Sequence, residues 1–252
     1  PLGTGPNSHS IRRSLREADI DTFEAGLVGD IGVAVAMVEG DGKTAQVIAS
    51  GVESESSPEL LAQVSLQEGD LVHVSGADLV NEGGARAIVD WVETLPDGVT
   101  VVVAATPAVG LVSAQTWVRI LQRADVLTMN NREAAVLTVM LKPYVEGDWF
   151  KGILRPDAAV VRRMGPLGCE VILEGGRDRT AIPAVPTEPG DTTGVGEVHI
   201  AVMCTALMQG ASLVDACQRA NAAASLALSH TTAFPVPTGE QVDEILAAPR
   251  TR

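Results

Sequence analysis

The stretch from Gly190 to Glu197 reads GDTTGVGE and leads directly into an apolar segment that begins at Val198. Apolar residues repeat in that segment at helical spacing, and Gly210 then supplies a residue type that commonly ends a helix. The stretch therefore predicts a tight turn before a helix N-terminus. Because the first amides of a helix lack internal partners and lie at the positive end of its dipole, the turn predicts an anion site suited to a phosphate, with Glu197 at its edge.

The composition limits the partners and the compartment of the chain. Its 252 residues suffice for one α/β domain, and the formal net charge of −14 argues against nucleic acid or an anionic membrane surface as the main partner. No apolar run reaches the ~18 residues of a membrane span, and the N-terminus does not resemble a signal peptide. The scattered Cys169, Cys204 and Cys217 indicate reduced thiols, so we expect a cytoplasmic protein.

Apolar strands alternate with helices along most of the chain. This order predicts βαβ units in a right-handed, mostly parallel sheet, whose ligands lie beyond the carboxyl ends of the strands. No linker is long enough to divide the chain, so we expect a single domain over residues 1–252. Strands are predicted at 71–75, 99–105, 125–128, 158–162 and 182–185, and helices after Ser57 and at 84–95, 113–123, 212–228 and 238–246.

The N-terminal part of the chain has a different pattern. Asn7 or Ser8 is expected to cap a helix from Ile11 to Ala18. Apolar strands on both sides of Asp41-Gly42 predict a β-hairpin. We therefore expect residues 29–52 to form a small β lid or an edge sheet.

Three polar or glycine-rich loops follow predicted strands, so they are expected to share one edge of the sheet: 130–133, 164–168 and 190–197. Asn130 and Glu133 are one helical turn apart, and their oxygens suit Mg²⁺, although the same pair is typical of a helix cap. Glu197 would be a general base for a hydroxyl beside the phosphate, or would only favour the helix dipole. No GK[ST] follows a glycine loop, which excludes a P-loop.

These motifs resemble those of the ribokinase/PfkB carbohydrate kinases. Residues 191–197 resemble the family's DTxGAGD signature, and Asn130-x-x-Glu133 resembles its NxxE motif. The turn from Gly165 to Gly168 is similar to the family's nucleotide-side glycine turn, and 221–224 resembles the helix that borders its adenine pocket. The resemblance implies a three-layer α/β/α fold with a small β lid, which often mediates dimers in the family.

The resemblance also implies an activity and a set of roles. The activity is the ATP- and Mg²⁺-dependent phosphorylation of a hydroxyl on a sugar or a sugar-like small molecule. In that assignment Glu197 is the catalytic base, and the anion hole is formed by Gly194, Val195 and Gly196. The nucleotide is lined by Gly165, Gly168, Asn221 and Asn130, the metal is held by Asn130 and Glu133, and a K⁺ loop includes Asp191 and Thr193.

The sequence departs from the family pattern at several points. Glu197 stands where the family has an aspartate, Val195 replaces a small alanine, and Ala105 stands where many members have an aspartate. The N-terminal part of the sugar site is expected to be absent from the numbered chain, so the acceptor is not identified. These departures leave open a catalytically weak relative that binds nucleotide or sugar and acts as a regulator or interaction protein. A third alternative is an α/β domain that only mediates assembly.

Overall fold

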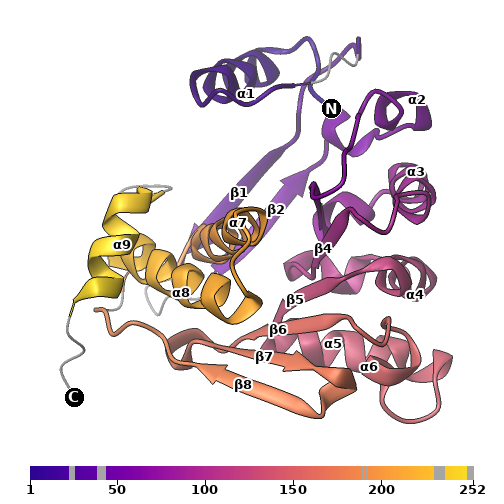
Figure 1. The fold of residues 1–252 in the computed structure, drawn as a ribbon. Helices are drawn as coiled ribbons and strands as arrows, with labels where there is room; N and C mark the ends of the chain where they lie inside the picture. The colour runs from indigo at the N-terminus through magenta and orange to yellow at the C-terminus, as the bar shows by residue number, and fades with distance from the viewer. Residues whose placement is uncertain (23–25, 39–43, 189, 191, 230–235, 249–252) are drawn as a thin grey trace. The chain divides into compact units, whose positions relative to one another are not determined.

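The computed structural model describes residues 1–22, 26–38, 44–188, 190, 192–229 and 236–248 (Figure 1). The chain divides into two compact units. One unit consists of Pro1–Leu66 and Asp78–Leu95, and the other of Gln67–Ala77 and Pro96–Arg252. Among the described helices, none combines the length and the apolar character needed to cross a membrane.

The first unit contains a two-stranded antiparallel sheet, which confirms the predicted hairpin (Figure 1). Val35 of β1 pairs with Val47 of β2, so these two side chains share one face of the sheet. The predicted turn at Asp41-Gly42 lies outside the described residues. The elements of this unit are α1 (Pro6–Glu17), β1 (Val33–Val38), β2 (Thr44–Ala49), η1 (Val52–Ser54), α2 (Pro58–Leu61) and α3 (Glu82–Glu93).

Helix α1 begins at Pro6, so the prediction of a helix that starts at Ile11 behind a cap at Asn7 or Ser8 is wrong. The acceptor for the first helical amides comes instead from Asp30. Its carboxylate accepts hydrogen bonds from the amide of Asn7 at 3.0 Å and from the amide and the hydroxyl of Ser8, both at 2.7 Å. Because Asp30 lies 22 positions from Ser8, the sequence next to the helix gives no sign of this cap.

We expect Asp30→Ala to loosen α1 and to lower the unfolding temperature, because it removes the acceptor of the first helical amides. Desolvation raises the pKa of Asp30, but hydrogen bonds from Ser8, Asn7 and Ile31 outweigh it and lower the pKa from 3.8 to about 2. The ionised carboxylate therefore stabilises the fold above pH 3.8, and this contribution disappears as the pH falls through about 2.

Hydrogen exchange at the amides of Asn7 and Ser8 should accelerate in Asp30→Ala but not in Glu17→Gln at the other end of α1. Equal exchange in both variants would contradict the assignment of Asp30 as the cap.

The second unit is built on a six-stranded sheet in the order β3-β4-β5-β6-β7-β8. Strands β3 to β6 pair in parallel, whereas β7 is antiparallel to both β6 and β8. The strands are β3 (Leu71–Ser75), β4 (Thr100–Ala104), β5 (Val126–Asn130), β6 (Ala159–Arg163), β7 (Cys169–Leu173) and β8 (Asp178–Ile182). The helices are α4 (Ala114–Arg123), α5 (Asn131–Leu141), α6 (Trp149–Gly152), α7 (Val195–Met208), α8 (Leu213–Ser229) and α9 (Gly239–Ala247), with short 3₁₀ turns η3 (Pro107–Leu111), η4 (Lys142–Tyr144), η5 (Gly165–Leu167) and η6 (Glu174–Gly176).

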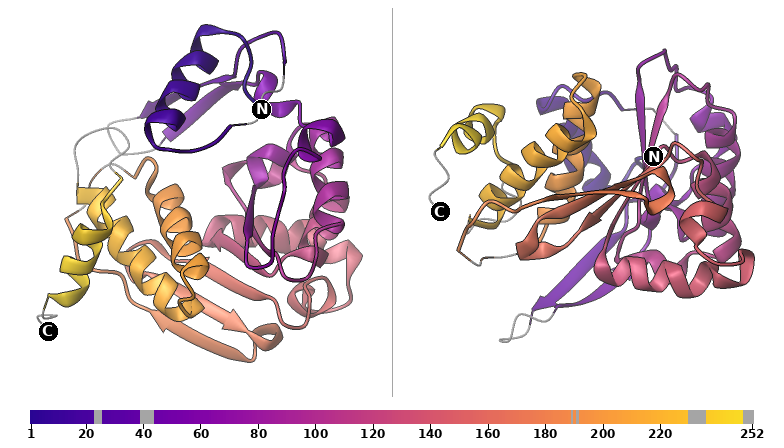
Figure 2. Two further views of the ribbon diagram at one scale, coloured as in Figure 1. Left: turned by 45° about the horizontal axis from the view of Figure 1, so that its top comes forward. Right: turned by 60° about the horizontal axis from the view of Figure 1, so that its bottom comes forward.

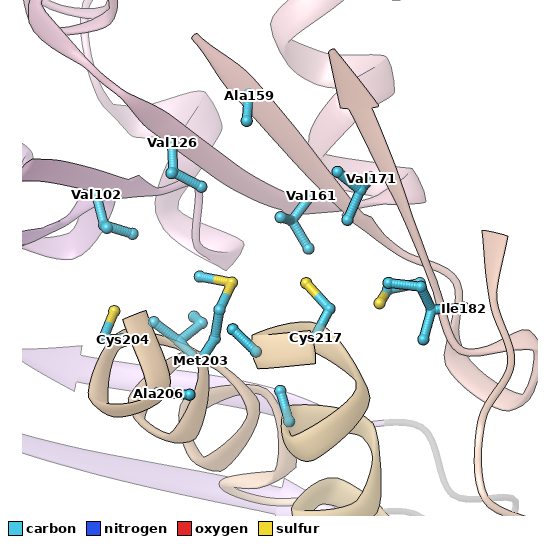
Figure 3. Close-up of a cluster of buried hydrophobic side chains, with 14 of the residues drawn as sticks. Val102, Val126, Ala159, Val161, Val171, Ile182, Met203, Cys204, Ala206 and Cys217 are labelled. Atoms are coloured by element: carbon cyan, nitrogen blue, oxygen red, sulfur yellow. The ribbon is translucent and has the colours of Figure 1, made fainter. Parts of the chain in front are cut away.

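Helices cover both faces of this sheet, which confirms the predicted three-layer α/β/α architecture (Figures 1 and 2). Helices α4 and α5 pack on one face, and α7 and α8 lie side by side on the other. Buried Val102, Val126 and Val161 of the sheet belong to one cluster with Met203 of α7 and Cys217 of α8 (Figure 3). This close-packed layer fixes the two helices against the strands that lead into the predicted loops.

Most predicted elements of the second unit are present, with small shifts at their ends. Thr238 and Gln241 form the predicted capping box of α9. The exception is the strand predicted at 182–185, because β8 ends at Ile182. The chain leaves the sheet at Pro183, which has no amide hydrogen to donate to a neighbouring strand.

Candidate active site

A cavity of about 650 Å³ lies in the second unit, beside the carboxyl ends of β5 and β6. The structure brings together here all three loops that the sequence placed at one edge of the sheet. Predicted site residues that line the cavity are Asn130, Gly165, Gly168, Val195, Gly196 and Asn221. The lining also includes Arg163, Thr192, His199 and the segment Ala184–Thr187, which follows β8.

The N-terminus of α7 lies at this cavity, which Val195 and Gly196 line. Gly194 caps the helix in the left-handed conformation, with a φ of 77° that glycine adopts without strain. The amide of Val195 donates to the carbonyl of Thr192 at 3.3 Å. In the part of the chain that the structure describes, the amides of Gly196 and Glu197 have no hydrogen-bond partner. Since both lie at the positive end of the helix dipole, they offer two donors to an anion.

Asn130 and Glu133 form a capping box at the start of α5. Asn130 Oδ1 accepts a hydrogen bond from the Glu133 amide at 2.9 Å, and Glu133 Oε2 accepts one from the Asn130 amide at 2.7 Å. Glu133 Oε1 accepts a third from Asn130 Nδ2 at 2.7 Å. Arg163 at the end of β6 completes the group, because its Nη2 lies 3.0 Å from Glu133 Oε2. The predicted helix cap is therefore present, and the carboxylate of Glu133 pairs with the guanidinium of Arg163.

The carboxyl group of Glu133 is buried, with a side chain that is 3% exposed. Burial raises the pKa of Glu133 above its ordinary value of 4.5, while the Asn130 amide and the charge of Arg163 lower it. The negative charge of Glu197 raises the pKa of Glu133 again. Two carboxylates and one guanidinium thus interact electrostatically near the N-terminus of α7.

This capping box determines how a magnesium ion would fit. Both carboxylate oxygens of Glu133 and the amide oxygen of Asn130 already accept hydrogen bonds. These two residues therefore fit Mg²⁺ through its water ligands better than by direct coordination, a mode that suits an ion that keeps several waters. Within the described ranges, no group of three or more His, Cys, Asp or Glu side chains is placed to hold a metal ion.

Gly165 and Gly168 form the turn between β6 and β7, and both have positive φ angles, 57° and 89°. A Cβ on Gly168 would overlap the carbonyl oxygen of Ile182 and the backbone of Pro183. Gly168 is therefore required by close backbone packing at the rim of the cavity. A Cβ on Gly165 would meet no atom within 4 Å, so the requirement at this position is the backbone conformation.

Asn221 of α8 fastens one wall of the cavity. Its Nδ2 donates to the carbonyls of Ile182 at 3.0 Å and Pro183 at 3.2 Å, and its Oδ1 lies 3.2 Å from Nε2 of His199. Asn221 and His199 are both buried. Because the amide group of Asn221 is already engaged, the structure gives this residue a part in shaping the cavity, and its contact with a nucleotide stays a prediction.

The remaining predicted residues lie around the helix N-terminus. Glu197 and Thr193 are exposed, and Asp191 lies outside the described residues. Val195 lines the cavity and also packs against the buried cluster that includes Val198. Val195, which is larger than the alanine of the family pattern, therefore packs partly against apolar side chains outside the cavity.

Arg163 and His199 line the cavity, but neither belongs to a motif that the sequence displays. Arg163 directly follows the apolar run 158–161 and Arg162. A basic side chain at the end of a buried strand is the signal that would have identified it. His199 gave no such signal, because its partner Asn221 lies on another helix.

The mostly parallel sheet between two layers of helices defines the class of this unit, a three-layer α/β/α protein with a cavity beside a helix N-terminus. Comparison with protein families then identifies the chain more closely. The family model described as pfkB family carbohydrate kinase matches residues 1–238, so the chain belongs to this family. It is a carbohydrate kinase, that is, a phosphotransferase with an alcohol acceptor. The predicted family is confirmed, and the alternative of a catalytically weak regulator is not favoured.

Similar proteins agree with this assignment. An uncharacterized sugar kinase of Escherichia coli (strain K12), YegV, is 28% identical over 247 residues, which cover 96% of this chain and 75% of the relative. An ATP-dependent ribose-1-phosphate kinase of Halopiger xanaduensis is 25% identical over 257 residues, covering 98% and 78%. Among solved structures, ribokinase from Thermotoga maritima superimposes with a TM-score of 0.80 at 19% identity and covers 98% of this chain and 80% of its own, which shows the shared fold.

Proposed function

We propose that this kinase transfers the terminal phosphate of ATP to a hydroxyl of a sugar or a sugar-like small molecule. The proposal is supported by the amides of Gly196 and Glu197, which have no partner among the described residues, and by a cavity of about 650 Å³ that Gly196, Asn130 and the glycine turn line. A cavity of this volume suits a nucleotide. The Halopiger relative is named as ATP-dependent, and a ribokinase from Cryptococcus neoformans with a TM-score of 0.78 at 18% identity was solved with ADP.

The proposed mechanism gives each part of the α7 N-terminus a role. Gly194, Val195 and Gly196 line the anion hole for the phosphate in transfer, and the amides of Gly196 and Glu197 are its donors. Glu197 accepts the proton of the acceptor hydroxyl while the hydroxyl oxygen attacks the terminal phosphorus of ATP. The new oxygen–phosphorus bond forms as the bond from that phosphorus to the β-phosphate oxygen breaks, and ADP leaves.

The other predicted residues are proposed to hold the nucleotide and its cation. Mg²⁺ would be held by Asn130 and Glu133 through water, and when bound it neutralises charge on the triphosphate. Gly165 and Gly168 would line the nucleotide, with Asn221 behind it. A K⁺ loop that includes Asp191 and Thr193 is part of the same proposal.

Calorimetry and an acceptor screen test this function. We expect the folded protein to bind ATP in the presence of Mg²⁺, and to lose that binding when EDTA removes the metal. ADP release is then measured with ribose, ribose 1-phosphate, fructose and nucleosides as candidate acceptors, because the relatives are named as sugar and ribose-1-phosphate kinases. A folded sample that binds no nucleotide with Mg²⁺ present would refute the proposal.

We propose that the hairpin within residues 29–52 acts as a lid that pairs with a second copy of the chain. Five residues share one face of it, three from β1 and two from β2: Val33, Val35, Met37, Val47 and Ala49. The four largest of these are between 50% and 61% exposed, an unusual density of apolar surface for a two-stranded sheet. A second copy would bury this face and would also remove an unpaired strand edge.

The double variant Val35→Lys/Val47→Lys is expected to convert a dimer into a monomer, since it places two charges opposite each other on the apolar face. Light scattering after size exclusion measures the change. Ile48→Lys is the matched control, because Ile48 is equally exposed at 62% but points to the opposite face. A wild-type monomer, or a dimer in the double variant, would contradict the proposal.

We also propose that the enzyme works in the cytoplasm. All three cysteines are free and buried, in agreement with the expectation from their scattered spacing. Reduced thiols are typical of that compartment.

A further inference from the structure

Arg163 occupies a position that the proposed mechanism does not use. It ends β6, lines the cavity, and has a side chain that is only 16% exposed. Nη2 of its guanidinium pairs with Glu133 Oε2 at 3.0 Å. Nη1 lies on the other side, 2.7 Å from the point where a Cβ on Gly196 would stand. The guanidinium therefore spans the distance from the α5 cap to the first turn of α7.

The guanidinium retains hydrogen-bonding capacity. A guanidinium carries five N–H donors, and Glu133 receives the one bond that the structure describes for it. Nε of Arg163 is buried and has no hydrogen-bond partner among the described residues. Leaving a buried charged donor without an acceptor is costly, and Arg163, unlike Arg162, lines the cavity, so a molecule bound there could supply the acceptor.

In the structure Glu133 accepts from Nη2 of Arg163 and does not accept from Nε. Its Oε2 already accepts from the Asn130 amide and from Arg163, and its Oε1 accepts from Asn130 Nδ2. Nη1 lies beside the first turn of α7, where the amides of Gly196 and Glu197 have no hydrogen-bond partner among the described residues. A guanidinium beside two amides of a helix N-terminus supplies the type of donors that the oxygens of a phosphate group accept.

We propose that Arg163 binds the terminal phosphate of the nucleoside triphosphate, and that Glu133 holds its guanidinium in place for this contact. The inference rests on the proposed function, since it requires ATP in this cavity. The charges of the neighbouring residues explain why a positively charged side chain is needed at position 163. Glu133 and Glu197 would both repel a phosphate dianion, and Arg163 offsets that repulsion.

The experiment compares ADP with a non-hydrolysable ATP analogue. In Arg163→Met the Kd for the analogue should rise about 10- to 100-fold, the effect of losing one or two charge-assisted hydrogen bonds, while the Kd for ADP changes less than about twofold. Calorimetry with Mg²⁺ measures both values. A general loosening of the site would weaken both nucleotides together, so the ratio of the two Kd values separates phosphate binding from a structural role.

Arg162→Met is the matched control, because Arg162 is the neighbouring residue and pairs with Glu170 at 2.8 Å outside the cavity. It should leave both Kd values unchanged. Arg163→Lys keeps the charge but loses the forked geometry, so it should recover only part of the analogue affinity. If Arg163→Met does not fold, the double variant Arg163→Met/Glu133→Gln replaces it, since it removes the buried charge on both partners.

The outcomes separate this inference from the proposed function. A wild-type protein that binds neither nucleotide would overturn both. A wild-type protein that binds both, with an unchanged ratio of Kd values in Arg163→Met or in the double variant, would overturn only the role of Arg163.

Discussion

Glu197→Gln is expected to lower kcat by about 10²- to 10⁴-fold and to leave the fold and the Kd for ATP nearly unchanged. The side chain is exposed in the first turn of α7, directly after the free amide of Gly196. Its carboxylate has no hydrogen-bond or ion-pair partner among the described residues, so it is free to accept a proton. Glutamine keeps the shape of the side chain but cannot act as a base. Steady-state kinetics with a saturating acceptor measure the effect.

The control for this prediction is Glu240→Gln. Glu240 is also an exposed acid in the first turn of a helix, α9. Its replacement by glutamine removes the same favourable interaction with a helix dipole but no proposed base. It should leave kcat unchanged. Full activity in Glu197→Gln would show that Glu197 is not the base.

Glu197→Asp asks whether the glutamate is adapted to this site. The family resemblance places an aspartate here, and the shorter side chain withdraws the carboxylate by roughly 1 Å. A displacement of that size can cost about 100-fold in rate, so we expect kcat to fall. A large gain in kcat would instead support a catalytically weakened relative.

Local patterns predicted those parts of the fold that local interactions determine. Ser57 and Thr238 cap the helices that their spacing predicted, and Gly194 precedes α7 in the left-handed conformation. In each case residues within a few positions decide whether the first amides of the helix have an acceptor. Ser57 and Thr238 accept hydrogen bonds from them, whereas Gly194 has no side chain to do so. For the same reason the three loops at the cavity could be located, since the carboxyl ends of parallel strands lie at one edge of a sheet.

Contacts between distant residues could not be predicted in this way. Asp30 caps α1 from 22 positions beyond Ser8, and Arg163 meets Glu133 across 30 positions. Both interactions depend on how the elements pack, and no spacing rule describes them. The NxxE motif shows the consequence. Its cap could be predicted from the pattern, whereas its ion pair with Arg163 could not.

Asn221→Leu is expected to lower the unfolding temperature by roughly 2–12 °C and to raise the Kd for ATP. Leucine has a similar size but leaves the carbonyls of Ile182 and Pro183 without a donor and His199 without a partner. An unsatisfied buried group costs about 1–3 kcal/mol, and in a chain of this size each kcal/mol corresponds to about 2–4 °C. Because the segment after Ile182 lines the cavity, loosening it should also weaken nucleotide binding.

Ser225→Ala is the matched control for the effect on stability. Ser225 lies one turn further along α8 and also lines the cavity, but its hydroxyl has no hydrogen bond among the described residues. Its replacement should change the unfolding temperature by less than about 2 °C. Thermal melts and calorimetry on the same samples then distinguish two roles for Asn221. If Asn221→Leu keeps the wild-type melting temperature but loses ATP binding, the residue contacts the nucleotide directly; if stability and affinity fall together, it acts by fastening the end of β8 to α8.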